Sequence, residues 1–578
     1  MTSRDAIHDD RPNDTLWSQA NMSEAIPGVA TPLTWSWWRL GFEVCNRRQW
    51  TRLGLLSRAE ANRAADPRTD FVSIFYGRPV VNVDALRSLF ARMPGGDAGA
   101  VERSFLGTTR PDATVPPAKR WRWPIIAIKL PWALVGLDRK VDRICTLVPP
   151  WWRERTSPGR YADVGSAQRG LAEAMAMFHR TQAVHGFVLM LGQLAFDRTA
   201  KICARAGRQD LLLALSASGN GTEETAVVND LWRAARREMS IDDVIARHGF
   251  HGPDEGALHA SSWREDPAPA VSLVERYRAL GAPKDSAARG HRRAAEEELL
   301  AALPRRARWS ARRALLSADM RIPRRERTKT AFLQVIDVGR AAARALGQHL
   351  HAEGLLDNPE DVFHLTLEEA TSAPLEIDRV LIAFRRERRA AYERLTVPSY
   401  FQGTPLPQPA EPLEERTTRP LQGVAAGGGV GTGPARIILR AEDAPDLLPD
   451  EVLVCHTTDP GWVPFMAISA GVVVDVGGPL SHAAIVAREM GIPCVVGVGD
   501  ATGRILNGDL LEVDGNCGTV SWRAGSADEP HQEVLVREDL DEMSHLDGPD
   551  AGRPAHLAED EGVEGMLAPA TQEEREVC

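Results

Sequence analysis

One stretch near the C-terminal end, residues 472–497, constrains the fold of this chain most, because it carries the pattern strand, tight turn, helix, strand. Val472–Val474 is a short run of β-branched residues, which is typical of a buried strand. Gly477-Gly478-Pro479 interrupts the run and allows a sharp turn. Ala483–Met490 are mostly strong helix formers, and Gly491 favours the end of a helix. The stretch therefore predicts a small α/β unit built around this helix.

The predicted helix begins at a histidine. Ser481 suits the N-cap position, so His482 is expected in the first turn. Unpaired backbone N–H groups and the positive end of the helix dipole meet at that place, and both stabilise a phosphate. A histidine there can act as a nucleophile that carries a phosphoryl group. For a single histidine, the alternative is that His482 only caps the helix.

The whole pattern argues against that alternative. It reads Gly-Gly-x-x-Ser-His-Ala-Ala-Ile-Val-Ala-Arg-Glu-x-Gly-Ile-Pro over residues 477–493. This closely resembles the swivelling phosphohistidine domain of the phosphoenolpyruvate-utilising enzymes, a family that includes phosphoenolpyruvate synthase, pyruvate phosphate dikinase and rifampin phosphotransferase. The resemblance implies that His482 is the residue that becomes phosphorylated.

Length and composition limit the other possibilities. With 578 residues, the chain is too long for one core, so two or more domains are expected. A net charge of −10 gives no reason to expect nucleic acid as a partner. The seven cysteines are scattered without a CxxC pair, which indicates neither a disulfide framework nor a zinc site. No signal peptide is recognised, and Lys129 and Pro131 interrupt the longest apolar segment, so we expect a cytoplasmic protein without a membrane partner.

The region from about residue 162 to 395 shows mainly helical periodicity. Apolar residues recur at three- and four-residue spacing in Arg169–Phe178, Arg292–Leu303 and Phe332–Leu350, and the charged faces of these helices are most simply solvated. Fifteen tryptophans against five tyrosines is unusual, and most of them precede residue 310. Two interpretations stay open: a large helical core, or an aromatic-walled cavity for a bulky apolar ligand.

Several short segments resemble, in the same order, the acceptor-binding domain of rifampin phosphotransferase. They are residues 21–28, 31–36, 74–82, 91–95 and 361–369. The resemblance implies a mainly helical substrate domain over residues 21–400, with residues 1–20 predicted to be a polar, disordered arm.

Residues 247–255 resemble the Gly-His-Arg-Gly-x-x-Glu turn of that family, with a departure. Phe250 stands where the family has histidine, and His251 stands where it has arginine. A charged contact is therefore missing or replaced. We regard His251 and Glu255 as candidate substrate-binding residues, with a purely structural turn as the alternative.

Residues 324–329 resemble the family's Arg-Glu-x-x-Lys element. Arg325 and Lys329 are four residues apart, so on a helix they share a face. Two cations on one face can hold a phosphate during transfer. The resemblance implies that Arg325 and Lys329 are catalytic together with His482, and that Glu326 orients the arginine; a basic stripe on a surface helix is the alternative.

The C-terminal third is expected to hold a linker, a domain and a tail. Residues 401–423 are proline-rich and predict a semi-rigid linker, residues 424–523 the phosphohistidine-type α/β domain, and residues 524–578 an acidic disordered tail. The loop at 457–464 resembles the Thr-Asp-Pro-Gly-Trp-x-Pro of the rifampin phosphotransferase branch and predicts a rigid loop near the histidine. Asp459, Trp462 and Ser481 are therefore further candidate substrate-binding residues.

The expected fold is multidomain: a mainly α-helical acceptor domain followed by a small α/β swivelling phosphohistidine domain. No ATP site is recognised in this sequence, so the first hypothesis is a phosphotransferase whose donor is a separate ATP-binding subunit and whose acceptor is a bulky, apolar small molecule. The second is a lyase or cyclase that acts on a phosphate or diphosphate ester through the histidine, arginine and lysine, with Mg²⁺ helping to bind the substrate. The third is a non-catalytic sequestering protein.

Overall fold

The computed structural model describes residues 4–523 except for residues 12–13, 21, 107–109, 111–113, 115, 118, 217–222, 281–287, 410–418, 441–442, 445–446, 459 and 479–480. The chain divides into two units, residues 1–527 and 528–578, and every element below lies in the first. The acidic tail predicted for residues 524–578 lies outside the described residues.

The α-helices are α1 (Met22–Ala25), α2 (Pro32–Leu40), α3 (Asn46–Arg52), α4 (Arg58–Ala61), α5 (Val83–Phe90), α6 (Ala98–Leu106), α7 (Trp123–Leu134), α8 (Leu137–Arg155), α9 (Val164–Ala206), α10 (Leu212–Ser216), α11 (Glu223–Ala235), α12 (Ile241–His248), α13 (Ala268–Leu280), α14 (Ala288–Ala302), α15 (Arg305–Ala352), α16 (Leu367–Thr371), α17 (Arg379–Glu393), α18 (Val463–Met466), α19 (His482–Met490) and α20 (Ala501–Arg504). The strands are β1 (Leu16–Ser18), β2 (Val72–Phe75), β3 (Arg78–Asn82), β4 (Leu395–Thr396), β5 (Tyr400–Gln402), β6 (Gln408–Pro409), β7 (Leu421–Gln422), β8 (Val424–Gly427), β9 (Val430–Ile437), β10 (Val452–Cys455), β11 (Gly471–Val474), β12 (Cys494–Val496), β13 (Leu510–Asp514) and β14 (Thr519–Trp522).

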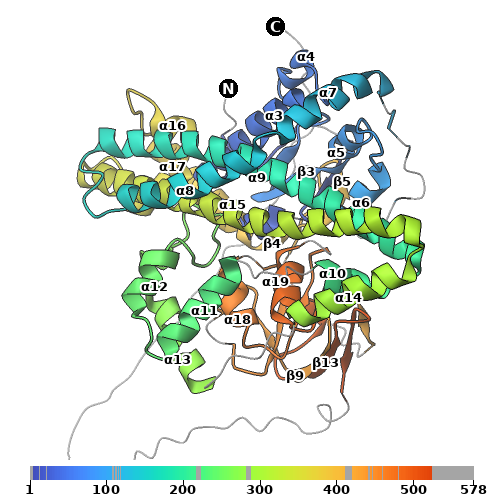
Figure 1. The fold of residues 1–578 in the computed structure, drawn as a ribbon. Coiled ribbons are helices and arrows are strands. Elements are labelled where there is room, and N and C mark those ends of the chain that lie inside the picture. Colours follow the sequence, from blue (N-terminus) through green and yellow to red (C-terminus); the bar gives the residue numbers. More distant parts are fainter. Residues whose placement is uncertain are drawn as a thin grey trace, which may run out of the picture. The chain divides into compact units, whose positions relative to one another are not determined.

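Two long helices, α9 and α15, pack along each other at the centre of the helical part (Figure 1). A capping box between Asp163 and Ser166 starts α9, and Gly207 ends it in the left-handed conformation, with a φ of 65°. The three stretches whose spacing predicts helices fall on α9, α14 and α15, as expected.

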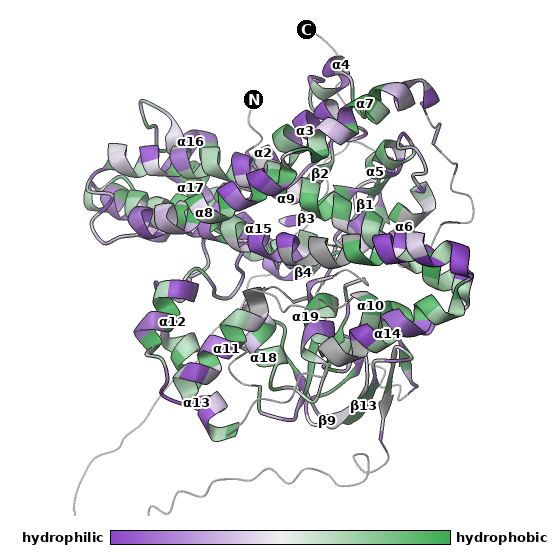
Figure 2. Cartoon of the chain, in the orientation of Figure 1, coloured by the Kyte–Doolittle hydropathy of each residue, from purple (hydrophilic) through white to green (hydrophobic). Residues whose placement is uncertain are grey.

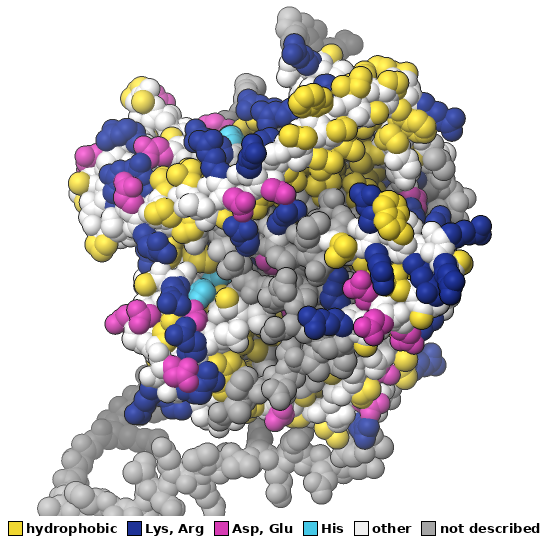
Figure 3. Space-filling view, in the orientation of Figure 1, with side chains coloured by type: hydrophobic (Ala, Val, Ile, Leu, Met, Phe, Trp, Pro, Cys, Tyr) yellow, Lys and Arg dark blue, Asp and Glu magenta, His cyan; other side chains and the backbone are white. Residues whose placement is uncertain are grey.

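Both long helices have the mixed surface of helices that bury one face. Hydrophilic and hydrophobic residues alternate along them in Figure 2. In Figure 3, many lysine and arginine side chains lie on the visible surface, and on α15 the arginines Arg305, Arg306, Arg312 and Arg313 are exposed. The interpretation of the charged faces as solvated surface is confirmed for these residues.

Aromatic side chains fill the core between α2, α9 and α15. The ring centroid of Trp37 lies 5.2 Å from that of Phe178, and the ring centroid of Trp38 lies 5.3 Å from that of Phe332. Nine tryptophans are buried in the described part of the chain: Trp17, Trp35, Trp37, Trp38, Trp50, Trp152, Trp232, Trp263 and Trp462. These tryptophans pack in cores, as the first of the two interpretations requires.

A four-stranded sheet, in the order β2-β3-β1-β5, lies at the N-terminal end of the chain. The central residue of β1, Trp17, is antiparallel to Asn82 on one side and to Phe401 on the other. The prediction of a disordered arm over residues 1–20 is therefore wrong for residues 4–11 and 14–20. A strand of three residues is too short to show a periodicity, and its partners are remote in the sequence.

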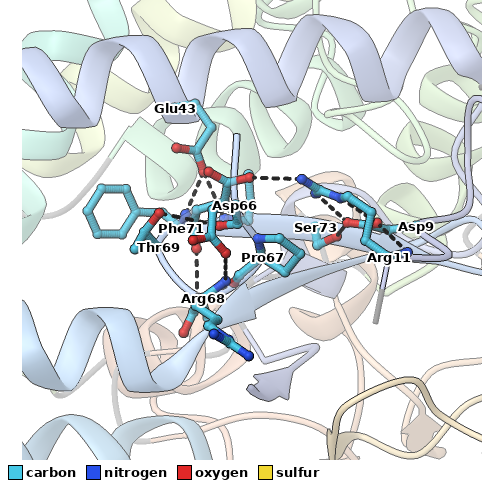
Figure 4. Close-up of polar contacts among 12 residues, drawn as sticks. Asp9, Arg11, Glu43, Asp66, Pro67, Arg68, Thr69, Phe71 and Ser73 are labelled. Atoms are coloured by element: carbon cyan, nitrogen blue, oxygen red, sulfur yellow. Dashed lines mark hydrogen bonds and ion pairs between the residues drawn. The ribbon is translucent and has the colours of Figure 1, made fainter. Parts of the chain in front are cut away.

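Polar side chains of the same arm fix it to the sheet, as Figure 4 shows. The Asp9 carboxylate accepts a hydrogen bond from the Ser73 hydroxyl and one from the Arg11 guanidinium, both at 2.6 Å. The backbone N–H of Asp9 donates to the Ile74 carbonyl at 2.8 Å. The polar residues that predict disorder are thus engaged in specific contacts.

The predicted linker, residues 401–423, is also partly built into sheets. Strand β5 pairs with β1, β6 pairs with β4, and β7 joins the second sheet through β14. Its central residues, 410–418, lie outside the described residues. At both ends, the segment is therefore sheet rather than linker.

The second sheet has eight strands in the order β7-β14-β13-β9-β10-β11-β12-β8. Strands β9 to β12 are parallel, and the strands on either side of them are antiparallel. Strands β10, β11 and β12 are buried along their whole length. This explains their uninterrupted apolar runs, because both faces of such strands are covered. The strand predicted at Val472–Val474 is present as part of β11.

Helices α11 to α13 share a hydrophobic core with this sheet. Leu231 of α11 and Tyr277 of α13 are fully buried in one cluster with Trp462, Phe465 and Met466. The Tyr277 hydroxyl donates to the Pro464 carbonyl at 2.9 Å. These helices were expected to belong to a substrate domain over residues 21–400, yet they pack against residues of the predicted phosphohistidine domain.

Replacing Trp17 with alanine tests the anchoring of the N-terminal arm. Trp17 is fully buried and its ring lies 5.8 Å from that of Phe75, so Trp17→Ala should lower the free energy of unfolding by about 3–5 kcal/mol. The side chain of Trp121 is 64% exposed, so Trp121→Ala should change it by less than about 0.5 kcal/mol. Chemical denaturation measures both, and equal effects would contradict the anchoring.

Candidate functional site

The N-terminus of α19 carries the histidine, as the sequence predicts. The Ser481 hydroxyl accepts a hydrogen bond from the Ala484 backbone N–H at 3.3 Å, and His482 is the first residue of the helix. The helix ends at Gly491, with a φ of 69°. Both Ser481 and His482 are buried, with 2% and 5% of their surface exposed. The prediction that Ser481 is the N-cap is confirmed.

A lysine from α15 contacts this histidine. The Lys329 Nζ lies 3.0 Å from the His482 Nδ1. An ammonium group can only donate, so Nδ1 accepts, and a neutral His482 ring then carries its proton on Nε2. The contact joins residues 153 positions apart and brings two of the three predicted catalytic residues together.

A carboxylate from α1 lies at the same helix end. The backbone N–H of His482 donates to Glu24 Oε2 at 3.1 Å. Burial raises the pKa of Glu24 to about 7, although this hydrogen bond and the charges of Arg325 and Lys329 lower it. Glu24 thus accepts from a backbone N–H group at a helix N-terminus, which is a place where an anion such as a phosphate would bind.

A second carboxylate, Glu326, lies beside both cations of α15. Its Oε1 is 3.6 Å from Arg325 Nε, and its Oε2 is 4.0 Å from Lys329 Nζ. Only 2% of Glu326 is exposed. That Glu326 orients Arg325 stays a prediction, and the structure adds Lys329 as a second neighbour of this carboxylate.

A further histidine, His185 of α9, faces the same part of α15. Its Nδ1 lies 2.9 Å from Thr328 Oγ1, and the hydroxyl proton of Thr328 is directed at the carbonyls of Arg324 and Arg325. Nδ1 therefore donates and Nε2 keeps its lone pair. Burial, and then the charges of Arg325 and Lys329, lower the pKa of His185 to about 3, so the ring is neutral at pH 7.

Sequence reasoning missed Glu24 and His185 for different reasons. Glu24 lies in the segment 21–28, whose resemblance indicated the start of a domain but no site residue. It is the only carboxylate in that segment, which was the available signal. His185 lies in the middle of a 43-residue helix, and no local pattern distinguishes it from a core histidine.

Four candidate residues remain, and the structure describes three of them. His251 and Glu255 form a buried pair with each other. Trp462 is 3% exposed and packs in the core shared with α11 to α13. Asp459 lies outside the described residues.

Two features are absent from the described part of the chain. No group of three or more histidine, cysteine, aspartate or glutamate side chains is arranged there to hold a metal ion. Among the described helices, none has the length and apolar character needed to cross a membrane.

Comparison with known protein families matches two segments of the chain. Residues 447–518 match "PEP-utilising enzyme, mobile domain", and residues 237–326 match "Rifampicin phosphotransferase fourth domain". The chain contains a mobile domain of the PEP-utilising enzymes. The resemblance inferred from the sequence around His482 is confirmed, and the mobile domain includes the strands β10, β11 and β12 and the helix α19.

Curated relatives agree with these matches. An uncharacterized protein of Mycobacterium tuberculosis is 27% identical over 557 residues, covering 88% of this chain and 62% of the relative. The rifampicin phosphotransferase of Streptomyces sviceus is 36% identical over 200 residues, covering 34% of this chain and 23% of the relative. The prodigiosin synthesizing transferase of Serratia marcescens is 30% identical over 331 residues, covering 55% of this chain and 37% of the relative. This chain spans less than two thirds of the length of each of these relatives.

Among solved structures, the NMR solution structure of Enzyme I is matched with a TM-score of 0.15 and 14% identity, over 56% of this chain and 80% of that chain. This likeness is too weak to carry an argument.

The raised pKa of Glu24 predicts a pH-dependent stability. A carboxyl group whose pKa rises from 4.5 to about 7 on folding contributes stability below about pH 4.5, and this contribution is lost as the pH rises through about 7. Glu24→Gln replaces the ionisable group with a neutral one of the same shape. The variant should therefore have a higher Tm than the wild type at pH 8, and a similar Tm at pH 5.

Glu238 supplies the matched control, because its exposed carboxylate pairs with Arg236 and has a lowered pKa. Glu238→Gln should not raise the Tm at pH 8. If Glu24→Gln gave the same Tm difference from the wild type at both pH values, Glu24 would not titrate in this range.

Proposed function

We propose that His482 carries a phosphoryl group and transfers it to a small-molecule acceptor bound at the helical part of the chain. The observation that carries this proposal is the 3.0 Å contact between Lys329 Nζ and His482 Nδ1. It joins the mobile-domain pattern to the Arg-Glu-x-x-Lys element, two segments with separate resemblances to phosphotransferases. A histidine that only capped a helix would not require a lysine from a distant helix.

The N-terminus of α19 suits a phosphohistidine. The backbone N–H of His482 donates to Glu24 in this structure, and a phosphoryl oxygen could take the place of that carboxylate. An ionised Glu24 would repel the phosphoryl group. Its pKa of about 7 means that a proton can remove this repulsion near neutral pH.

In the transfer step, the bond between phosphorus and the His482 nitrogen breaks while a bond forms between phosphorus and an acceptor oxygen. Lys329 and Arg325 neutralise the phosphoryl oxygens, whose charge must be stabilised during in-line transfer. The His482 nitrogen that held the phosphorus keeps the electron pair of the broken bond and takes up the proton that the acceptor hydroxyl loses. His482 thus leaves the step as a neutral ring.

The names of two relatives support a small-molecule acceptor. One is a rifampicin phosphotransferase and the other a prodigiosin synthesizing transferase. That the acceptor of this chain is bulky and apolar stays a prediction. We keep the prediction that a separate ATP-binding subunit loads His482. Mg²⁺ stays a prediction for the phosphate-bearing donor, and no step here runs through it, since the described residues form no metal-binding group.

Phosphorylation of His482 is the first prediction to test. The full chain would be incubated with Mg²⁺ and ATP or phosphoenolpyruvate, with and without an extract of the source cells, and its peptides examined by mass spectrometry for an acid-labile phosphate. We expect the phosphate on His482 only when extract is present. His482→Ala should abolish the label, and His456→Ala, which removes a half-exposed histidine of the same domain, should retain it.

Lys329→Met separates loading from transfer. Lys329 lies on α15 and not on the mobile domain, so the labelled histidine should still form. The rate of phosphoryl transfer from His482 to an acceptor such as rifampicin should fall by about 100-fold or more, because Lys329 stabilises the charge of the transition state.

Two outcomes of the labelling experiment count against the proposal. Label on the His482→Ala variant would overturn it, and absence of label in every condition would favour the lyase or sequestering alternatives.

A further inference from the structure

A second site lies on a different face of α15. Helices α8, α11, α12 and α15, together with the loop after α12, line a partly open cavity of about 290 Å³ (all four helices are labelled in Figure 1). Its polar lining includes Arg153, Arg247, His248, His251, Arg327 and Gln334. This volume is enough for a ligand of roughly ten non-hydrogen atoms, because a water molecule takes about 30 Å³ of liquid.

The cavity is separate from the site at His482. A helix turns through 360° in 3.6 residues, so Arg327 lies about 200° around α15 from Arg325, and Gln334 lies about 140° from Lys329. Arg325 and Lys329 are therefore on one side of the helix, and the residues that line the cavity are on the other. A ligand in the cavity would not occupy the place of a phosphoryl group on His482.

A buried histidine–carboxylate pair lines the cavity. His251 Nδ1 lies 2.5 Å from Glu255 Oε1, and only 6% of His251 and 1% of Glu255 are exposed. The carboxylate accepts and Nδ1 donates, so Nε2 holds the lone pair. The backbone on both sides of His251 is fixed, because its N–H donates to the His248 carbonyl and its own carbonyl accepts from the Trp263 N–H. This geometry holds a ring nitrogen ready to accept a hydrogen bond or a proton.

The charge of the lining favours an anion. Three arginines line the cavity. One of them, Arg247, donates to Asp230 at 3.2 Å, and the same carboxylate is bonded to His248 at 3.1 Å. Arg327 pairs with Asp142 at 3.1 Å, but both side chains are well exposed, so the pair is weak. Arg153 is exposed as well. Arg153 and Arg327 can therefore turn toward an anionic ligand at little cost.

One buried acceptor in the lining lacks a donor. Gln334 is 4% exposed, and its Oε1 has no hydrogen-bond partner among the described residues. Burying an acceptor without a donor is unfavourable, so this oxygen indicates a group that is not part of this chain. The ligand must therefore offer a donor such as a hydroxyl in addition to its negative charge.

We propose that this cavity binds a small hydroxylated anion, a hydroxy acid or a phosphate monoester of a small alcohol. Arg153 and Arg327 bind its anionic group, and its hydroxyl donates to Gln334 Oε1 or to His251 Nε2. The site does not depend on the phosphorylation of His482, so it stands if the proposed function fails.

Isothermal titration of the full chain tests the site with four probes. Lactate carries a hydroxyl and a carboxylate, and glycerol 3-phosphate carries hydroxyls and a phosphate. 3-Phosphoglycerate carries all three kinds of group, and succinate carries carboxylates alone. We expect at least one hydroxylated probe to bind at least about tenfold more tightly than succinate. The order of lactate and glycerol 3-phosphate distinguishes a carboxylate ligand from a phosphate ligand.

Three variants locate the binding. Arg327→Gln, at a side chain that is 41% exposed and so not needed for folding, should weaken binding at least about tenfold. Arg312→Gln removes the same charge from an exposed position of α15 that lies 15 residues, or about 22 Å, from Arg327 along the helix, and should leave binding unchanged. Gln334→Leu should reduce the preference for hydroxylated probes over succinate. If none of the probes binds, or if Arg327→Gln and Arg312→Gln bind alike, the proposal is wrong.

Discussion

The charge balance at the N-terminus of α19 is the constraint on which the site depends. Three positive groups meet there: the end of the helix dipole, Lys329 and Arg325, all in largely buried surroundings. Two carboxylates, Glu24 and Glu326, offset them. Burial, and then the charges of Arg325 and Lys329, lower the pKa of His185 and keep its ring neutral. Without a phosphoryl group on His482, Glu24 helps to neutralise the positive charge at this helix end. A doubly negative phosphoryl group would neutralise it instead.

The core shared by α11–α13 and the mobile domain bears on how this domain can move. Leu231 and Tyr277 are fully buried against Trp462 and its neighbours. A rotation of the mobile domain that left these helices behind would expose large apolar side chains at about 2 kcal/mol each, and would break the hydrogen bond from the Tyr277 hydroxyl to the Pro464 carbonyl. A rotation that keeps this core intact therefore carries α11 to α13 along with residues 424–523, the range that the sequence predicts for the domain.

Helix α15 connects the two sites of the chain. It presents Arg325 and Lys329 to the histidine of the mobile domain on one side, and Arg327 and Gln334 to the cavity beside α12 on the other. Both faces are cationic, which suits anions in both places. Because α15 packs along α9 over much of its length, it is a rigid support for the side chains of both sites.

The sequence by itself determined the features that depend on neighbouring residues. The strand, turn and helix around His482, its cap at Ser481 and the spacing of Arg325 and Lys329 all follow from residues within a few positions of each other. Only the tertiary structure decided what depends on distant partners: the carboxylate of Glu24 on the His482 N–H, the ring of His185 beside Thr328, the pairing of Leu16–Ser18, and the packing of α11–α13 on the sheet. Single polar residues and three-residue strands carry no periodic signal, so their roles emerge only when packing brings them together.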